Sequence, residues 1–393
     1  MKATIALLIA AIGTTAFAAE TSQPRNERFK AACESYRESC MEWVDALRSV
    51  GTDEKRKASL LKSLPSLERA AGYAAQVIVA DPTDAISFDA MTWLLPYLDQ
   101  AEVTAVLAEV TSPKKGDPAQ KVDVVSLLVT HHVNNPKLVL AIRNIERQTP
   151  AVDKFLRSLM EKSASAEIRG VAAYWLAGFF LEVTENMELS SAHREAASAV
   201  AQSLLLKAAS EKDAADVRIG KTRKLGPATA NALQGLRVLG IGKPLSDVAG
   251  NTVAGPSARL SDYKGKVLVI DVWATWCPPC RALIPHLKEI TAHYAKKPFA
   301  LVGISADAEK ETVVDFLEAK KLPWPQWWDG DDGPVAKALG VRFYPTLLLV
   351  DHKGIIRYKN VHDAEKLKEL IAKLVAEAEA DKAASVRPEG ENR

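Results

Sequence analysis

The chain has 393 residues and a formal net charge of +2, with 48% hydrophobic and 25% charged residues. This length indicates two or three domains, because one domain usually takes about 100–200 residues. The composition is that of an ordinary globular protein. A nearly neutral chain creates no strong field toward nucleic acid or an acidic membrane surface, so we exclude functions that depend on one.

The N-terminus has the pattern of a secretory signal peptide over residues 1–19. Lys2 supplies the positive region, residues 3–11 form a short apolar core, and Ala16-Phe17-Ala18 places small residues where a signal peptidase cuts. The core is short for a membrane span, and an uncleaved N-terminal anchor is the alternative. We therefore expect an exported, periplasmic protein in an oxidising compartment, where disulfide chemistry operates.

Residues 20–220 are predicted to form an all-helical domain of unknown role. Apolar residues recur at intervals of three and four, as on the face formed by Phe29, Cys33, Tyr36 and Cys40. Segments of roughly 12–20 residues joined by short loops resemble stacked helical hairpins. The sequence leaves open whether this domain binds a partner, orients a substrate or dimerises.

The pattern changes after residues 221–240, a basic segment with glycine and proline that predicts a linker, with the pattern of one short helix at 228–236. Nearly continuous apolar runs rich in β-branched residues then predict buried strands at 266–273, 299–305 and 346–350. Helical patterns lie between and after these strands, at 281–294, 309–319, 335–339 and 364–378. This alternation predicts an α/β domain over residues 241–380, followed by a charged, disordered tail at 381–393.

Two cysteines separated by two residues follow the first predicted strand and begin a helix. The Cys277 thiol at the helix N-terminus would lie near unsatisfied N–H groups and the positive end of the helix dipole. Both favour the thiolate, and in such motifs the thiol pKa falls from about 8.5 to values reaching about 3.5. We expect Cys277 to attack a disulfide and Cys280 to resolve the mixed disulfide. Pro278 and Pro279 take early helical positions, where a missing N–H costs little.

A structural disulfide, half of a zinc site and peroxidase chemistry by a lone low-pKa cysteine are three other interpretations of this motif. Zinc requires further ligands at Cys or His spacing, and the sequence has no second CxxC or CxxH nearby. We therefore expect no metal and no external cofactor. The redox-active group would be the Cys277–Cys280 disulfide itself.

The residues around the cysteines resemble the TlpA/ResA-like branch of the thioredoxin superfamily. The likeness is carried by Leu260–Lys266, Ala274–Ala282 and Gly340–Thr346, and it covers about residues 241–378. It implies a thioredoxin-like fold, in which helices flank a central mixed sheet. It also implies an exported enzyme that reduces or oxidises disulfides of protein substrates, served by a membrane-bound electron donor or acceptor.

The same resemblance implies roles for residues near the motif. Pro345, preceded by Tyr344, matches a cis-proline that offers backbone groups to an extended substrate peptide; a trans proline at a strand edge is the alternative. Trp276 would flank the reactive sulfur and pack against substrate, and simple shielding of the helix start is the alternative. Pro285 matches the proline that kinks the active-site helix.

An acidic residue completes the implied site. Asp271 lies six residues before the first cysteine, where thioredoxins carry a buried carboxylate that accepts a proton when the second cysteine attacks. Burial is expected to raise its pKa, and the alternative is a strand-end Asp bonded to local backbone. One position departs from the family, because Leu283 stands where members often have Glu. This departure disfavours a role in cytochrome c maturation, and Asp271 could replace the missing acid.

A second cysteine pair, Cys33 and Cys40, lies in the helical region. On one straight helix the two Cα atoms would be about 10 Å apart, which exceeds the reach of a disulfide. A structural disulfide would need a break in that segment. A disulfide, two buried thiols and a redox relay stay open, and the disulfide is preferred because free thiols are uncommon in oxidising compartments.

The sequence thus predicts an exported thiol–disulfide oxidoreductase that acts on protein substrates through a CPPC motif. The alternative is a partner-binding helical protein whose CPPC is a structural disulfide. The direction of electron flow, as in a reductase or an isomerase, is not readable, because the compartment and the partner set it.

Overall fold

The computed structural model describes residues 24–50, 53–109, 122–145, 147–186, 188–220, 223–331 and 333–386. The predicted signal peptide at 1–19 lies outside the described residues, as do residues 387–393 of the predicted tail. The chain divides into two compact units, Met1–Ile168 and Arg169–Arg393.

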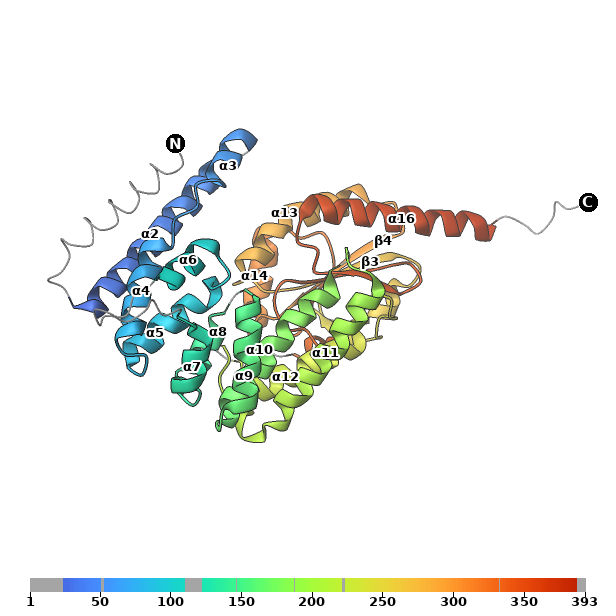
Figure 1. Ribbon diagram of the computed structural model, residues 1–393. Coiled ribbons are helices and arrows are strands. Elements are labelled where there is room, and N and C mark those ends of the chain that lie inside the picture. Colours follow the sequence, from blue (N-terminus) through green and yellow to red (C-terminus); the bar gives the residue numbers. More distant parts are fainter. Residues whose placement is uncertain are drawn as a thin grey trace, which may run out of the picture. The chain divides into compact units, whose positions relative to one another are not determined.

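The described residues of the first unit form helices joined by loops (Figure 1). Its elements are α2 (Arg25–Ser49), α3 (Glu54–Leu60), α4 (Glu68–Ala80), α5 (Ala85–Leu94), η1 (Leu95–Tyr97), α6 (Ala101–Glu109), α7 (Val124–His132), α8 (Leu138–Arg143) and α9 (Pro150–Lys162). Several helices begin where a side-chain oxygen accepts an N–H of the first turn, as at Asp84 and Thr149. Neighbouring helices pack in succession, with α4 against α2, α5 and α6, and α7 against α5 and α9. The predicted all-helical character is confirmed.

The second unit combines helices with a seven-stranded sheet. Its helices are α10 (Ala166–Glu185, which begins just before the unit), α11 (Ser191–Ser210), η2 (Lys212–Ala214), α12 (Leu225–Val238), η3 (Leu260–Tyr263), α13 (Pro278–His293), α14 (Lys310–Lys320), α15 (Pro334–Leu339) and α16 (Ala364–Val386). Its strands are β1 (Ala249–Thr252), β2 (Ser257–Arg259), β3 (Val267–Trp273), β4 (Phe299–Ser305), β5 (Gln326–Trp328), β6 (Thr346–Val350) and β7 (Ile356–Lys359).

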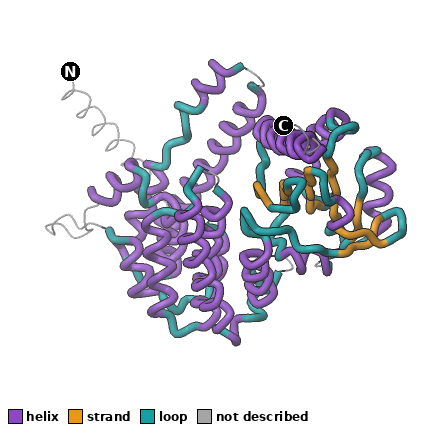
Figure 2. The backbone as a smooth tube through the Cα atoms, turned by 90° about the vertical axis from the view of Figure 1, so that its right-hand side faces the viewer, coloured by secondary structure: helices purple, strands orange, loops and turns teal. Residues whose placement is uncertain are grey.

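The sheet is mixed, with the strand order β2-β1-β5-β4-β3-β6-β7. Strand β4 pairs in parallel with β3 and β5, whereas β6 runs antiparallel to both β3 and β7. Every residue of β3 is buried, as a central strand covered on both faces requires. Figure 2 shows the strands, in orange, with helices on both sides. The predicted thioredoxin-like arrangement of a mixed sheet flanked by helices is confirmed.

Two hydrophobic clusters hold helices against the two faces of the sheet. On one face, Val267 and Val269 of β3 pack with residues of α13 and α16, including Leu287 and Leu374. On the other face, the alternate residues of β3 pack with α15 and with Leu239, which follows α12. Because successive strand residues point to opposite faces, the odd-numbered residues of β3 all face α13.

The compact unit that holds the sheet begins at Arg169, whereas the sequence predicts the domain boundary in a linker at 221–240. Residues 225–238 of that segment form α12, which packs against α11 and α15. Pro227 lies in its first turn, where backbone N–H groups have no intrahelical partner. Gly235, one of the glycines that suggested a linker, is required by packing, since a Cβ at this position would lie 2.7 Å from the carbonyl oxygen of Gly340. Glycine here allows close contact between two elements.

The C-terminal helix also differs from expectation. Helix α16 continues to Val386, so residues 381–386 of the predicted tail are helical. Asp381 pairs with His352 at 3.0 Å and with Lys353 at 2.7 Å, which ties this end of the helix to the turn after β6. No helix in the described part of the chain combines the length and apolarity of a membrane span.

Candidate active site

The CPPC motif lies where β3 gives way to α13. Cys277 is the N-cap residue of the helix, and its Sγ accepts the N–H of Cys280 at 3.2 Å. Pro278 and Pro279 are the first two helical residues, where no intrahelical N–H bond is lost. The sulfur of Cys277 therefore lies at the positive end of the helix dipole, an environment that favours a thiolate.

Cys277 and Cys280 form a disulfide with an S–S distance of 2.07 Å and a Cα–Cα distance of 5.3 Å. Both are nearly buried, and they pack with Trp273 and Ala274 at the end of β3. Trp276, directly before the motif, is 60% exposed. A large apolar side chain thus stands in solvent beside the disulfide, available to a partner.

The loop before β6 contacts the residues beside the CPPC motif. The Tyr344–Pro345 peptide bond is cis, as the sequence predicts. The rings of Tyr344 and Trp276 meet edge to face at 5.8 Å between centroids. Phe343, 38% exposed, lies in the same loop.

A groove of about 620 Å³ lies between α13 and this loop. One wall is formed by residues of α13, including Pro279 and Leu283, and the other by the segment Phe343–Pro345. His362, Asp363 and Ala364 close one side. Leu283, where the family often has Glu, presents an apolar surface and also packs into the core. The groove is therefore mostly apolar next to the disulfide, with polar groups at one side.

Asp271 is buried in the middle of β3, 3% exposed, and faces α13 between Val269 and Trp273. Val269 packs with Leu283, and Trp273 packs with both cysteines, so Asp271 lies beneath the first turns of α13. Its Oδ1 has no hydrogen-bond partner among the described residues. Burial raises the pKa of Asp271 from 3.8 to about 7, in the direction that the sequence predicts.

Gln326, which the sequence does not mark as a site residue, lies on the same face of the sheet as this carboxylate. Asp271 pairs in register with Gly303, and Gly303 with Gln326. A Cβ at Gly303 would lie 2.2 Å from Gln326 Oε1, so the carboxamide lies over the glycine on the face of Asp271, one strand away. Its Oε1 accepts from Trp273 Nε1 at 3.0 Å, while its Nε2 has no partner in the described part of the chain.

A second missed residue, Asp307, holds the turn before the cysteines. Its carboxylate accepts the N–H of Thr275 at 3.0 Å and the hydroxyl of Thr275 at 2.6 Å. It also accepts the hydroxyl of Ser305 at 2.7 Å. Asp307 follows β4 at the edge where β3 also ends, and the carboxyl ends of neighbouring parallel strands meet there. That placement is the signal from which the sequence could have indicated it.

We expect Asp307→Asn to destabilise the protein by about 2–3 kcal/mol, because the amide places a donor against the N–H of Thr275 and removes a charged acceptor. Urea unfolding followed by tryptophan fluorescence measures the change. Asp315→Asn is the matched control on the exposed side of α14, with an expected change within about 0.5 kcal/mol. Equal midpoints for the two variants would contradict this role of Asp307.

The preferred disulfide between Cys33 and Cys40 is wrong. Helix α2 runs unbroken from Arg25 to Ser49, and both residues are free thiols on it. Seven residues of helix separate them by about 10 Å, which no disulfide spans. Burial raises the pKa of Cys33 to about 12, so it is poorly suited to redox chemistry.

Pro285 lies inside α13, as the sequence predicts.

No group of three or more His, Cys, Asp or Glu residues converges as a metal site in the parts of the chain that the structure describes.

The C-terminal part of the chain is similar to known redox proteins. The sequence profile of the AhpC/TSA family matches residues 241–359. The thiol-disulfide oxidoreductase ResA of Bacillus thuringiensis is 30% identical over 136 residues, which are 34% of this chain and 78% of that protein. The chain belongs to the ResA-like thiol–disulfide oxidoreductases.

Other known proteins are similar to this chain over a comparable share of its length. The thiol:disulfide interchange protein DsbE of Pseudomonas aeruginosa is 33% identical, over 31% of this chain and 66% of that protein. A solved thiol:disulfide interchange protein from a Bacteroides species is 27% identical, covers 35% of this chain and 90% of its own, and has a TM-score of 0.32. The family consists of enzymes, so this chain is a thiol–disulfide oxidoreductase, and protein thiols in general are its class of substrate.

Proposed function

We propose that this protein is an exported thiol–disulfide oxidoreductase that exchanges disulfides with protein substrates through Cys277 and Cys280. The observation that carries the proposal is the position of the disulfide at the N-terminus of α13, beside an apolar groove and a cis-proline loop. A purely structural disulfide would need neither a groove nor an exposed Trp276.

The exchange takes two steps. In the reducing direction, the Cys277 thiolate attacks one sulfur of a substrate disulfide, the substrate S–S bond breaks, and its other sulfur leaves as a thiolate. Cys280 then loses its proton and attacks Cys277, so that the Cys277–Cys280 disulfide forms and the second substrate sulfur leaves. Two electrons pass from the cysteine pair to the substrate, and the reverse sequence oxidises a dithiol.

Asp271 is the group that we assign to the proton of Cys280. It lies on the face of β3 beneath α13, and its pKa of about 7 lets it take and release a proton near neutral pH. Asp271 is only 3% exposed, so bulk water has little direct access to it.

The substrate is proposed to bind as an extended peptide along the cis-proline loop. Backbone groups around Pro345 would pair with the peptide as an added strand does. Trp276, Tyr344 and Phe343 supply exposed or half-exposed aromatic surface for its side chains.

The proposal has three further parts. The protein is exported, it needs no external cofactor, and a membrane-bound partner donates or accepts its electrons. The pattern of residues 1–19 supports export. A disulfide pair carries two electrons without another group, so a separate redox partner must restore it after each cycle.

The reduction potential of Cys277–Cys280 tests the proposal. The full chain is equilibrated with dithiothreitol or glutathione buffers, and the two states are counted by intact mass, which also shows whether a signal peptide has been removed. A value around −270 mV indicates a reductase, and one near −120 mV an oxidase or isomerase. A value below about −300 mV with slow exchange would leave the alternative, a helical binding protein with a structural CPPC.

A further inference from the structure

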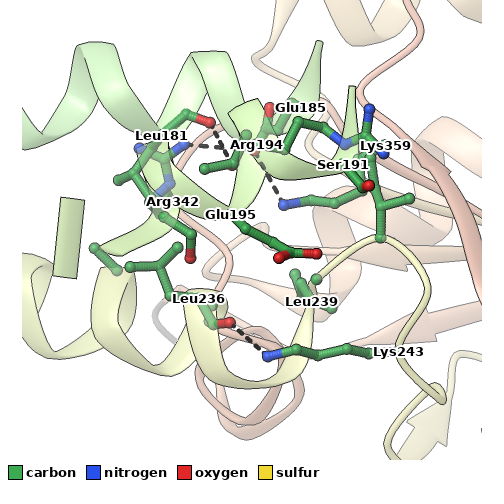
Figure 3. A pocket seen from close by; sticks show the side chains of 17 residues that line it. Leu181, Glu185, Ser191, Arg194, Glu195, Leu236, Leu239, Lys243, Arg342 and Lys359 are labelled. Carbon is green, nitrogen blue, oxygen red and sulfur yellow. Dashed lines mark hydrogen bonds and ion pairs between the residues drawn. The ribbon is translucent and has the colours of Figure 1, made fainter. Parts of the chain in front are cut away.

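The helical segment before the family domain makes direct, buried contacts with the loop that carries Pro345. These contacts centre on Glu185, the last residue of α10, which lines a pocket of about 160 Å³ together with Arg342 and Lys359 (Figure 3). The AhpC/TSA family profile matches residues 241–359, and Glu185 lies outside this region. The loop residue Arg342 and the strand residue Lys359 lie within it.

Glu185 has three partners and little exposure. Its Oε1 lies 3.0 Å from Lys359 Nζ and 3.6 Å from Arg342 Nη2, and its Oε2 accepts Asn360 Nδ2 at 2.7 Å. The side chain is 13% exposed. Burial alone would raise the pKa of Glu185, but the charges of Lys359 and Arg342, together with the hydrogen bonds from Asn360 and Lys359, outweigh burial and hold the pKa below its usual range. The carboxylate is therefore a charged, fully partnered group that is expensive to remove.

These partners hold both ends of the cis-proline loop. On one side, the guanidinium of Arg342 lies over the Phe343 ring at 5.4 Å, and Phe343 lines the groove. On the other side, Asn360 brackets Leu347, donating its N–H to the Leu347 carbonyl at 2.8 Å and accepting the Leu347 N–H at 3.2 Å. One carboxylate thus connects to the residues before and after Pro345.

Three further contacts come from α12 and from Arg223, which lies just before it, and they reach the loop and the end of α15 that precedes the loop. Arg223 donates to the carbonyl of Arg342, and Gln234 donates to the carbonyl of Ala338 at 3.0 Å. Gly235 lies against Gly340, close enough to exclude a side chain at either position. A loop held at this many points loses little conformational entropy when a peptide binds.

We propose that the helical segment 169–238 is a brace for the substrate loop 340–345, with Glu185 as its positioning residue. The brace preorganises the loop for extended peptides, so it favours peptide disulfides over small disulfides that do not contact the loop. This inference rests on the function proposed above, because it concerns the same loop.

The test compares two disulfides with the reduced full chain. One probe is a cysteinyl peptide of about ten residues joined to glutathione, long enough to contact the loop at about 3.3 Å per residue. The other is 2,2′-dipyridyl disulfide, which has no peptide backbone. Stopped-flow tryptophan fluorescence follows both reactions.

We expect Glu185→Gln to slow the peptide reaction at low peptide concentration about tenfold, through a higher half-saturation concentration and not a lower maximal rate. Its reaction with dipyridyl disulfide should stay within about twofold of the unaltered chain. The control is Glu195→Gln, an exposed carboxylate that lines the same pocket and should leave both reactions unchanged. Amide exchange at Leu347 should accelerate in Glu185→Gln and not in the control.

The outcomes separate the two proposals. Equal behaviour of Glu185→Gln and Glu195→Gln, or an equal loss with both probes, overturns the brace. If the unaltered chain reacts with neither probe, the proposed function fails, whereas Leu347 exchange still reports on the brace. If Glu185→Gln does not melt cooperatively, Arg342→Gln tests the same contact from the loop side, with the same peptide-selective loss expected.

Discussion

Cys277→Ser is expected to lose thiol–disulfide exchange by at least about 10³-fold, because a serine hydroxyl neither ionises at neutral pH nor forms a disulfide. The measurement is the rate at which the dithiothreitol-supplied protein reduces a peptide disulfide. The expected size follows from the geometry, since Cys277 is the N-cap residue at the groove and Cys280 lies one turn into the helix.

Cys280→Ser should behave differently from Cys277→Ser. The attacking sulfur remains, so the first step proceeds and the mixed disulfide accumulates, visible as one added peptide mass. Cys33→Ser is the control for a cysteine outside the site, and it should keep full activity, because burial raises the pKa of Cys33 to about 12. If the mixed disulfide accumulated on Cys280 in Cys277→Ser, and none formed in Cys280→Ser, the assigned roles would be reversed.

Asp271→Asn is expected to slow resolution by Cys280 about 10²-fold, because an amide cannot accept the proton. With Asp271 present, the resolution rate should rise with pH through an inflection near 7, where the carboxyl ionises. The variant should lack this inflection. Single-turnover release of the peptide from the mixed disulfide, measured between pH 5 and 9, provides the profile.

The same substitution should stabilise the protein at high pH. The folded pKa of about 7 exceeds the ordinary value of 3.8, so between these values the folded state binds more protons than the unfolded state. The unfolding free energy of the unaltered chain therefore falls as pH rises through this window, by about 1.4 kcal/mol per unit of difference, or about 4 kcal/mol in all. Asp271→Asn avoids this loss.

The two effects of Asp271→Asn should thus oppose each other above pH 7, with slower resolution and a higher unfolding free energy. Urea unfolding at pH 5 and pH 8 measures the second effect, with Asp315→Asn as the exposed control. An unfolding free energy that changes with pH equally in Asp271→Asn and the unaltered chain would show that Asp271 does not titrate in this window.

The redox motif could be predicted from the sequence because its information is local. A buried strand, a turn and a proline-rich helix start all lie within Val267–His293, and each follows from a few adjacent residues. The cis bond before Pro345 was also anticipated, since the Gly340–Thr346 segment matches a known pattern. Burial of Asp271 is what the resemblance to thioredoxins implies, and the structure confirms it.

The partners of these residues were not predictable, because they come from distant segments. Gln326 lies over Gly303, on the face of the sheet that carries Asp271, only because Gly303 has no side chain, a matter of register across three strands. Asp307 reaches Thr275 from 32 residues away. For Cys33 and Cys40, rarity of free thiols suggested a bond, but the unbroken helix keeps the sulfurs apart.

By itself the sequence determined the chemistry, namely a cysteine pair at a helix start in a thioredoxin-like domain, because helix caps, strand periodicity and the CPPC motif act over a few residues. The tertiary structure decided where the redox unit begins and what holds its substrate loop. Glu185 and Lys359 are 174 residues apart, and no local pattern marks an ion pair of that separation. Such contacts exist only after α10 and α12 have packed on the domain, so the packing of the whole unit decides them.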